Sequence, residues 1–500
     1  MKRAIFPKRI LSVILCLAFA VPCFAFSDLS AHAAGDEPPR SAWEMTVPQI
    51  RVTTAEGNGT TLQKEDDYQD ASIIITDTDG SVLSDDCLFK VRGNTTALSW
   101  VTKKPFTFKF AKKKNVLGLG SGKKWALIAN AFDPTLLRNI TAFEIAKELE
   151  LAYTSEYKVV ELWVDDSFRG CYTLFEPVQE GKDRVDIDIE SNDGKKDFLI
   201  EYEKNRVEDD VTYFTVGNLR FIASEPEEPT EEQLAYIHDT MEIIYFTIRG
   251  GNRERIESLI DVESFAKFFL LNEYMKTFDF DMSSVFYYYK DGKLYGGPAW
   301  DYDLSSGNSY SEYGARGKAT VDPEGMHANK NLMQQLASQE WFIDEVRKIY
   351  RRHYAFFADI GADGGFLDTQ LAAYSDVFAR NYSEAGWKVN KWWINISRQP
   401  DKTYAANFDY LKEWCMARND WMRSYYLPYE GLYVPGDANG NGTVEINDAT
   451  TVQRHIAELE LLDEPRLSAA DVDRDGSVTV EDVTILQRWL AEFEVEYEIG

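Results

Sequence analysis

The alternation of apolar and polar residues changes its period near residue 230. Before that point, short apolar runs with a period of two, separated by polar turns, predict β-strands. The strand candidates are residues 71–76, 88–92, 105–110, 125–130, 158–164, 170–176 and 197–202. One helix is predicted in this half, over residues 136–151, because apolar residues recur there three and four positions apart. The first half is therefore predicted to be β-rich, with 197–202 continuing the same sheet.

After residue 230 the apolar period lengthens to that of amphipathic helices. The helix candidates are residues 230–248, 261–276, 330–358 and 408–426, and a β-hairpin at 284–290 and 294–300 interrupts them. The predicted fold class is α+β, with a β-rich first lobe and a helical second lobe. A short proline-glycine hinge leads from the second lobe to a small all-α repeat at the C-terminus.

This C-terminal repeat contains two copies of one loop followed by a helix, 34 residues apart. Oxygen-bearing side chains stand at loop positions 1, 3 and 5, glycine at 6, a further ligand at 7 and a carboxylate at 12. That is the ligand order of a calcium loop, where a hard cation takes six or more oxygens and glycine permits the sharp turn. We predict two Ca²⁺ sites, with ligands Asp437, Asn439, Asn441, Thr443 and Asp448 in the first and Asp471, Asp473, Asp475, Ser477 and Asp482 in the second.

The duplicated loop and helix resemble a type I dockerin, which we place at residues 436–495 after a linker at 428–435. As in dockerins, position 12 is aspartate, and Pro435-Gly436 stands where an EF-hand would carry its first helix. The resemblance implies calcium-dependent docking onto a cohesin domain of a scaffold protein, as in cellulosomes. Partner choice in that family depends on loop positions 10 and 11. These are Ile446-Asn447 and Val480-Glu481, so the two faces differ and the cohesin type stays open.

The N-terminus has the pattern of a secretory signal peptide over residues 1–34. Basic residues precede an apolar run at 10–26, and small residues follow at 31–34. An uncleaved membrane anchor is the alternative, but the run is short for a bilayer and Pro22 interrupts it. We therefore expect a secreted, extracellular protein that has no contact with a membrane after signal cleavage.

Composition narrows the possible partners. The formal net charge is −29, so a general electrostatic field will not attract nucleic acid or anionic lipid. After signal removal, Cys87, Cys171 and Cys415 remain, an odd and sparse set that does not make a disulfide framework. Since 44% of the residues are hydrophobic, the fold can depend on its core.

Two acidic clusters flank the predicted hairpin at 284–300, one with Asp279 and Asp281 and the other with Asp301 and Asp303. Convergent carboxylates can hold Mg²⁺ against a triphosphate and can orient a hydroxyl for in-line attack. The alternative is a pair of solvated acidic turns. However, Asp279 follows a strongly apolar helix and Asp301 follows an apolar strand. Buried carboxylates need a cation or a hydrogen-bond partner.

Six short segments, in order, are similar to the CotH (spore coat protein H) kinase family, a secreted branch of atypical protein kinases. The similarity covers residues 45–427 and implies a two-lobe kinase-like fold. It also implies phosphoryl transfer from ATP, with Mg²⁺ or Mn²⁺, to a protein hydroxyl. The segments are Arg92-Gly-Asn-Thr-Thr96, Lys103-Lys104-Pro-Phe, Lys124-Trp-Ala-Leu with Leu136-Leu-Arg138-Asn139, Gly170-Cys-Tyr-Thr-Leu-Phe-Glu176, the segment around Asp279, and Pro298-Ala-Trp-Asp301-Tyr-Asp303.

Carried over by motif, the resemblance assigns the two acidic clusters to catalysis and metal binding. Asp279 would be the catalytic aspartate that orients the acceptor hydroxyl, and Asp301 would hold the metal. Asp303 would be a second ligand or a stabiliser of its loop. Lys104 would bind phosphate, with Lys124 as the alternative. Glu144 or Glu148 would pair with that lysine.

Three further assignments follow from the resemblance. Arg138 would contact phosphate or brace the site. The segment Glu176-Pro177-Val178 would be the hinge bordering the adenine, read through its backbone. Ser284 stands five residues after Asp279, where kinases often carry a metal-binding asparagine, and its hydroxyl is a weaker ligand. This departure leaves room for a slow enzyme or a pseudokinase.

The sequence therefore supports a scaffold-borne protein kinase, with a non-catalytic binding or structural component as the alternative. A third reading is a carbohydrate-active enzyme that uses paired carboxylates. Docking is common to the first two interpretations, so nucleotide binding separates them. Polysaccharide hydrolysis assays test the third. The acceptor protein is not predicted.

Overall fold

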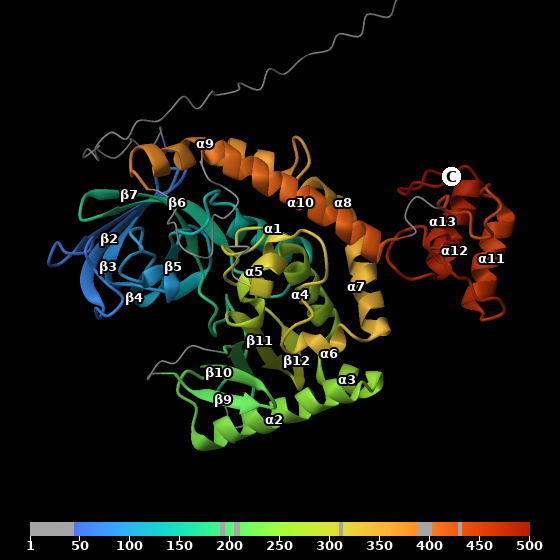
Figure 1. Cartoon of the computed structure of the whole chain (residues 1–500), viewed down its shortest axis with the longest axis horizontal. Coiled ribbons are helices and arrows are strands. Elements are labelled where there is room, and N and C mark those ends of the chain that lie inside the picture. The colour runs from blue at the N-terminus through green and yellow to red at the C-terminus, as the bar shows by residue number, and fades with distance from the viewer. Residues whose placement is uncertain (1–44, 191–195, 205–210, 310–313, 388–402, 429–432) are drawn as a thin grey trace, which may run out of the picture.

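The computed structural model describes residues 45–190, 196–204, 211–309, 314–387, 403–428 and 433–500. The chain forms a β-barrel, a helical body with a second sheet, and a separate C-terminal module (Figure 1). The predicted α+β class is confirmed. The predicted signal peptide at 1–34 and residues 429–432 of the predicted linker lie outside the described residues.

Seven strands close the barrel in the order β1-β2-β3-β4-β5-β7-β6. The last seam is a parallel pairing of β1 with β6, while the other neighbours are antiparallel. Alternate side chains such as Ile73, Phe89 and Trp125 fill the interior. The bounds of the barrel strands are β1 Gln49–Thr54, β2 Gln69–Thr76, β3 Val82–Val91, β4 Phe106–Asn115, β5 Ser121–Ile128, β6 Tyr157–Val164 and β7 Ser167–Phe175.

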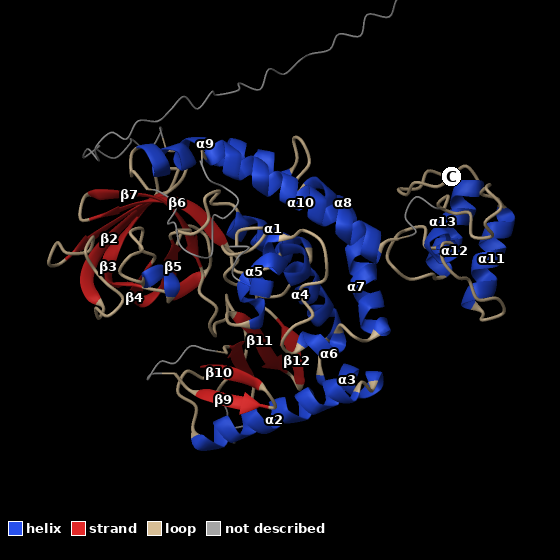
Figure 2. Ribbon diagram, viewed as in Figure 1, coloured by secondary structure: helices blue, strands red, loops and turns tan. Residues whose placement is uncertain are grey.

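The second sheet has five antiparallel strands in the order β12-β11-β8-β10-β9. The strand predicted at 197–202 is β8 of this sheet, so the prediction that it continues the first sheet was wrong. Helix α2 (Glu231–Gly250) packs against this sheet through β9 (Figure 2). The bounds are β8 Phe198–Tyr202, β9 Tyr213–Val216, β10 Leu219–Glu225, β11 Val285–Lys290 and β12 Lys293–Gly296.

Helix α4 (Val262–Met275) is the centre of the helical body, and every residue from Phe265 to Met275 is buried. It packs against α1, α7 and β12. The helix predicted over 330–358 is divided into α6, α7 and α8, because Gln339 and His353 leave helical geometry. The other helices are α1 Arg138–Glu148, α3 Arg253–Leu259, α5 Gly314–Val321, α6 Met333–Leu336, α7 Glu340–Arg352, α8 Tyr354–Asp359, α9 Phe366–Ser383 and α10 Tyr404–Tyr426.

An ion pair inside the body joins α4 to α10. Glu273 and Arg418 are both fully buried, and their charged atoms are 2.6 Å apart. We expect Arg418→Met to lower the free energy of unfolding by about 3–5 kcal/mol, because Glu273 would be left as an uncompensated buried charge. Urea denaturation measures this. Arg347→Met, which removes a partly exposed pair on α7, is the control and should cost no more than about 1 kcal/mol. Equal losses would contradict the expectation.

The C-terminal module is all-α, with α11 (Ile446–Ile456), α12 (Arg466–Ala470) and α13 (Val480–Leu490). Its small core includes Val452 and Leu486. Ile499 also packs into this core, and the amide of Gly500 donates to the carbonyl of Pro435 at 3.0 Å. Ile499 and Gly500 therefore contact the module beyond the boundary predicted at 495.

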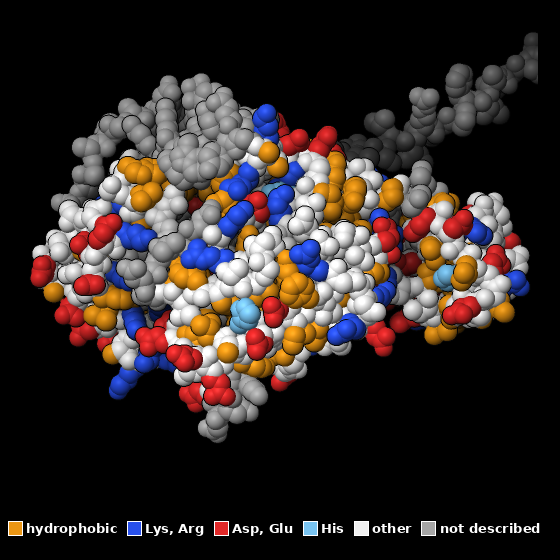
Figure 3. Space-filling model, turned by 60° about the horizontal axis from the view of Figure 1, so that its bottom comes forward, with side chains coloured by type: hydrophobic (Ala, Val, Ile, Leu, Met, Phe, Trp, Pro, Cys, Tyr) orange, Lys and Arg blue, Asp and Glu red, His pale blue; other side chains and the backbone are white. Residues whose placement is uncertain are grey.

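The described surface carries charges of both signs. On the face shown in Figure 3, acidic side chains lie on the main body and on the C-terminal module, with lysines and arginines between them.

The cysteines Cys87, Cys171 and Cys415 are free and buried. Within the described ranges, no helix has the combined length and apolarity needed to span a bilayer.

Candidate functional site

A cleft of about 940 Å³ opens between the barrel and the second sheet. The barrel side contributes basic residues, and the sheet and the loops beside it contribute acidic ones. An apolar part is lined by Ile128, Phe143, Phe175, Val178 and Trp300. The charged lining residues are Lys64, Lys90, Arg92, Lys124, Glu201, Glu203, Asp279, Asp301 and Asp303.

Two loops bring the predicted acidic clusters to one end of the β11–β12 hairpin. Asp279 lies on a short 3-10 helix (Phe278–Asp281) after α4, and Asp301 and Asp303 follow β12. The amide of Phe278 donates to the carbonyl of Leu304 at 2.8 Å, which ties the first loop to the second. Ser284 Oγ donates to Asp301 Oδ2 at 3.4 Å. Asp279, Ser284, Asp301 and Asp303 therefore share one cleft.

Burial sets the electrostatics of these carboxylates. It raises the pKa of Asp279 to about 7, and the nearby charge of Asp301 adds to the rise. Desolvation in the cleft also raises the pKa of Asp301, although its side chain reaches solvent, and the guanidinium of Arg92 partly opposes this rise. The pKa of Asp303 is raised further, by burial and then by the charges of Asp301 and Asp279. Such crowding favours protonation or a bound cation.

The backbone is strained at two of these residues. Ser284 has φ of +59° and Asp301 has φ of +66°, a left-handed conformation that non-glycine residues rarely adopt. The amide of Ser284 donates to Glu201 Oε1 at 3.2 Å, which holds the turn against β8. Strain of this kind is maintained where the surrounding structure fixes a functional geometry.

The loop that carries Asp279 is anchored by contacts of the residues just before it. Lys276 Nζ donates to the carbonyls of Asp322 and Glu324, and His327 Nε2 lies 2.7 Å from the carbonyl of Thr277. At the other end of the loop, Arg316 Nε lies 3.0 Å from Asp281 Oδ1. The loop is therefore fixed at both of its ends.

The structure gives Lys104 a different position from the one predicted. Its ammonium donates to the carbonyls of Ala97 at 2.8 Å and Leu98 at 2.5 Å, so it braces the segment after β3 and does not line the cleft. Lys124, the predicted alternative, lines the cleft. The glutamates proposed to pair with the lysine have other partners. Glu144 accepts from Tyr157, and Glu148 pairs with His353.

Arg138 and Glu176 also lie behind the cleft wall. Arg138 is fully buried, pairs with Asp133 at 2.6 Å, and donates to the carbonyls of Ser305 and Ser306. Of its two predicted roles, this geometry matches bracing. Glu176 lies 3.5 Å from Arg184. Its backbone bonds to Ser155 and Glu156, whereas the next two residues of the predicted hinge, Pro177 and Val178, line the cleft.

Sequence reasoning missed Glu201, Glu203 and Arg316. Glu201 and Glu203 lie in and directly after the otherwise apolar strand β8, and both are buried. A carboxylate that interrupts an apolar strand was an available signal. Arg316 lies in α5, far along the chain from Asp281, and nothing in its local sequence marks that pairing.

The pKa of Asp279 gives a measurable pH dependence. Because the folded pKa is raised from 3.8 to about 7, the folded chain binds a proton that the unfolded chain has lost within this window. Stability should therefore fall as pH rises from about 4 to 7. Without added metal, we expect the free energy of unfolding of wild type, relative to Asp279→Asn, to fall by up to about 1.4 kcal/mol per pH unit. Urea denaturation across this window checks it, and a flat difference would contradict it.

In both loops of the C-terminal module, hydrogen bonds hold the backbone as in a cation-binding loop. Asp448 and Asp482, at position 12, are fully buried. Asp448 accepts from the amides of Asn439 and Glu445, and Asp482 accepts from those of Val472 and Thr479. Each carboxylate thus links the start of its loop to its helix.

Ligand atoms converge most closely in the second loop. Carboxylate oxygens of Asp471, Asp473 and Asp475 lie within 4.8 Å of one another. Asp471 Oδ1 is buried and has no hydrogen-bond partner, and burial raises the pKa of this carboxyl to about 7. A cation would satisfy the unpartnered oxygen, so these residues fit calcium. In the same loop Ser477 donates its amide to Asp475, and in the first loop Thr443 donates to Asn441.

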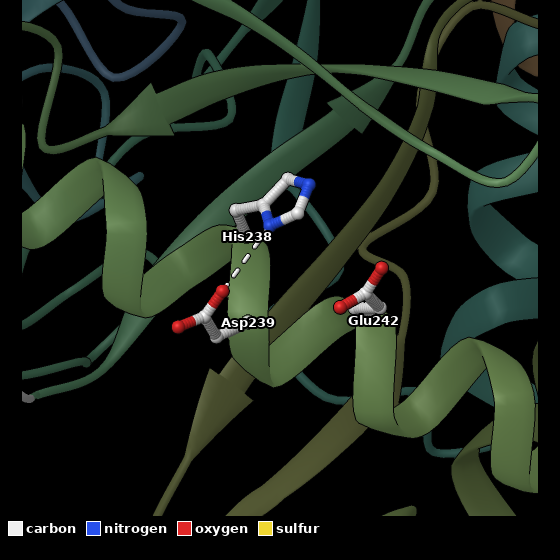
Figure 4. Close-up of side chains that lie close together, drawn as sticks. All are labelled: His238, Asp239 and Glu242. Carbon is white, nitrogen blue, oxygen red and sulfur yellow. Dashed lines mark hydrogen bonds and ion pairs between the residues drawn. The ribbon is translucent and has the colours of Figure 1, made fainter.

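A third cluster, on α2, consists of His238, Asp239 and Glu242 (Figure 4). His238 Nδ1 lies 3.3 Å from Asp239 Oδ1. Asp239 and Glu242 are exposed, and His238 is half-buried. Solvated acidic groups of this kind are common on a chain this acidic, so we assign the cluster no ligand.

The barrel, the acidic cleft and the paired loops define an α+β protein with a C-terminal calcium-loop module. The profile of the CotH kinase protein family matches residues 89–422, and that of the dockerin type I domain matches residues 435–491. The chain therefore belongs to the CotH kinase protein family and carries a type I dockerin. Both resemblances found in the sequence are confirmed. No curated protein matches the chain. Type I dockerin domains bind calcium, and this one implies a cohesin partner.

Proposed function

We propose that this protein is a secreted kinase that transfers the γ-phosphoryl group of ATP to a protein hydroxyl while its dockerin anchors it to a cellulosome-type scaffold. One observation carries the proposal. Asp279, Asp301 and Asp303 share a cleft whose opposite wall is basic. Phosphoryl transfer needs both signs of charge, cations for the phosphates and carboxylates for the metal.

The cleft divides into regions that match the parts of a nucleotide. Its apolar part, lined by Phe143, Val178 and Trp300, would take the adenine. Lys90, Arg92 and Lys124 would bind the phosphates, and Lys124 takes the role first assigned to Lys104. Asp301 and Asp303 would hold Mg²⁺ or Mn²⁺, which, when bound, neutralises charge that develops on the phosphates. Asp303 is buried, Asp301 is exposed to the cleft, and the crowding of their charges fits such an ion.

Asp279 would accept the proton of the acceptor hydroxyl as its oxygen forms a bond to the γ-phosphorus. The bond from that phosphorus to the β–γ bridging oxygen breaks, and ADP leaves with its electron pair. A pKa of about 7 suits a base that works near neutral pH. Arg316 acts through Asp281, with which it pairs, and so positions the loop of Asp279.

A pseudokinase is the second candidate, and Ser284 favours it. A serine hydroxyl replaces the amide expected at this position, and it already donates to Asp301. In that case the cleft would bind nucleotide weakly or not at all, and docking would be the function. Both candidates include calcium-dependent binding to a cohesin outside the cell.

A nucleotide thermal shift separates the candidates. We expect ATP with Mg²⁺ or Mn²⁺ to raise the melting temperature of wild type but not of Asp301→Ala. Labelled ATP with casein-like acceptors then tests transfer. No shift with either metal would contradict nucleotide binding and favour the pseudokinase. A shift without transfer would mean that the cleft binds nucleotide but does not catalyse its use.

A further inference from the structure

The second calcium loop of the dockerin lies against the C-terminal end of α7 in the main body (Figure 1). Arg351 Nη2 donates to Ser468 Oγ at 3.1 Å, and Arg352 Nη2 donates to the carbonyl of Asp475 at 2.8 Å. A Cβ on Gly476 would lie 2.4 Å from Cβ of Lys348, so the loop backbone packs directly on the helix. We call Lys348, Arg351 and Arg352 the basic end of α7.

This contact reaches the calcium ligands themselves. Asp471 is at loop position 1, and its Oδ2 accepts from the amide of Gly476 at 3.0 Å and lies 3.4 Å from Arg351 Nη1. Its Oδ1 is buried and has no partner, and it belongs to the cluster of carboxylate oxygens described above. One oxygen of Asp471 is therefore open to a cation, while the other faces the guanidinium of Arg351.

The two loops differ in charge in a way that fits this contact. At its predicted ligand positions the second loop has four carboxylates, Asp471, Asp473, Asp475 and Asp482. The first loop has two, because asparagines replace aspartates at positions 3 and 5. The basic end of α7 thus meets the more acidic loop, and Arg351 supplies a cation to Asp471, which the neighbouring carboxylates would otherwise repel.

We propose that calcium and the basic end of α7 compete for the charge of the second loop. Arg351 and a bound Ca²⁺ would share Asp471, and two cations on one carboxylate repel each other across a partly buried site. The α7 contact therefore lowers the calcium affinity of this loop. Because linkage is reciprocal, calcium in the loop weakens the attachment of the dockerin to the main body. The proposal rests on calcium binding by the dockerin and does not depend on catalysis in the cleft.

Calcium titration of the full chain against a chelating dye tests the competition. We expect Arg351→Gln to tighten one of the two calcium sites by about tenfold and to leave the other unchanged, since couplings of this kind are typically about 5–150-fold. Arg351→Lys keeps the charge and should stay close to wild type. Arg352→Gln should tighten the same site by a smaller factor, because its partner is a carbonyl.

Arg347→Gln is the matched control, since Arg347 lies on the same helix and pairs with Glu340 and Asp344. It should bind calcium as wild type does. The proposal is overturned if Arg351→Gln leaves both affinities unchanged or weakens one, or if Arg351→Lys behaves like Arg351→Gln. A chain that binds no calcium at either loop would instead refute the calcium binding on which the proposal rests.

Discussion

Replacing Asp279 with asparagine is expected to reduce phosphoryl transfer by about 10²–10⁴-fold, because the amide cannot accept the proton of the acceptor hydroxyl. Nucleotide binding should persist, since Asp279 would contact the acceptor rather than the metal. Asp301→Asn should instead abolish the thermal shift that ATP produces with metal. Measuring transfer and thermal shift on both variants separates the two roles.

Asp291→Asn is the matched control for these variants. Asp291 is an exposed aspartate in the turn of the same β11–β12 hairpin, at the end away from the cleft. It should transfer phosphate at the wild-type rate. If Asp279→Asn retained full activity, or if Asp301→Asn kept a metal-dependent shift, the assignment of the cleft would be wrong.

Removing calcium is expected to unfold the dockerin and leave the main body folded. The module has a small core, and Asp448, Asp471 and Asp482 are buried carboxylates whose charge a cation must offset. At a calcium concentration 100 times the dissociation constant, each occupied site adds about 2.7 kcal/mol of stability. Chelation should remove that contribution from both sites.

Hydrogen exchange measures this effect by region. With EDTA, amides in residues 435–500 should exchange much faster, while those of the barrel and α4 should keep their rates. Binding to cohesin should be lost under the same conditions. Unchanged exchange in the C-terminal region would contradict a structural role for calcium. Uniform loss of protection would mean that the two parts do not fold separately.

Local sequence predicted most elements because their signals are local. The seven strand candidates correspond to β2–β8, and the helix at 261–276 corresponds to α4. Closure of the barrel was not predictable in this way. It depends on pairing β1 with β6, whose residues lie more than 100 positions apart, and no periodicity marks that contact.

In the cleft, too, sequence could identify residues that have a local signal but not those that only the fold brings together. Asp279 and Asp301 could be found because each follows a strongly apolar element, where an unpaired carboxylate is costly. The lysine proposed to bind phosphate could not be chosen from sequence, because Lys104 lies just before β4 and Lys124 lies within β5. Only the fold shows that backbone carbonyls hold the first and that the second lines the cleft. Arg316 could likewise be identified only from the structure, through its long-range ion pair with Asp281.

Burial of the three cysteines determines how their thiols react in an oxidising medium. Burial raises the pKa of Cys87, Cys171 and Cys415 to about 12. At pH 7 only about one thiol in 10⁵ is then a thiolate, the form that attacks disulfides and reacts with oxidants. Once folded, the protein should withstand air and peroxide without a reducing agent, and it should not form mixed disulfides with other proteins.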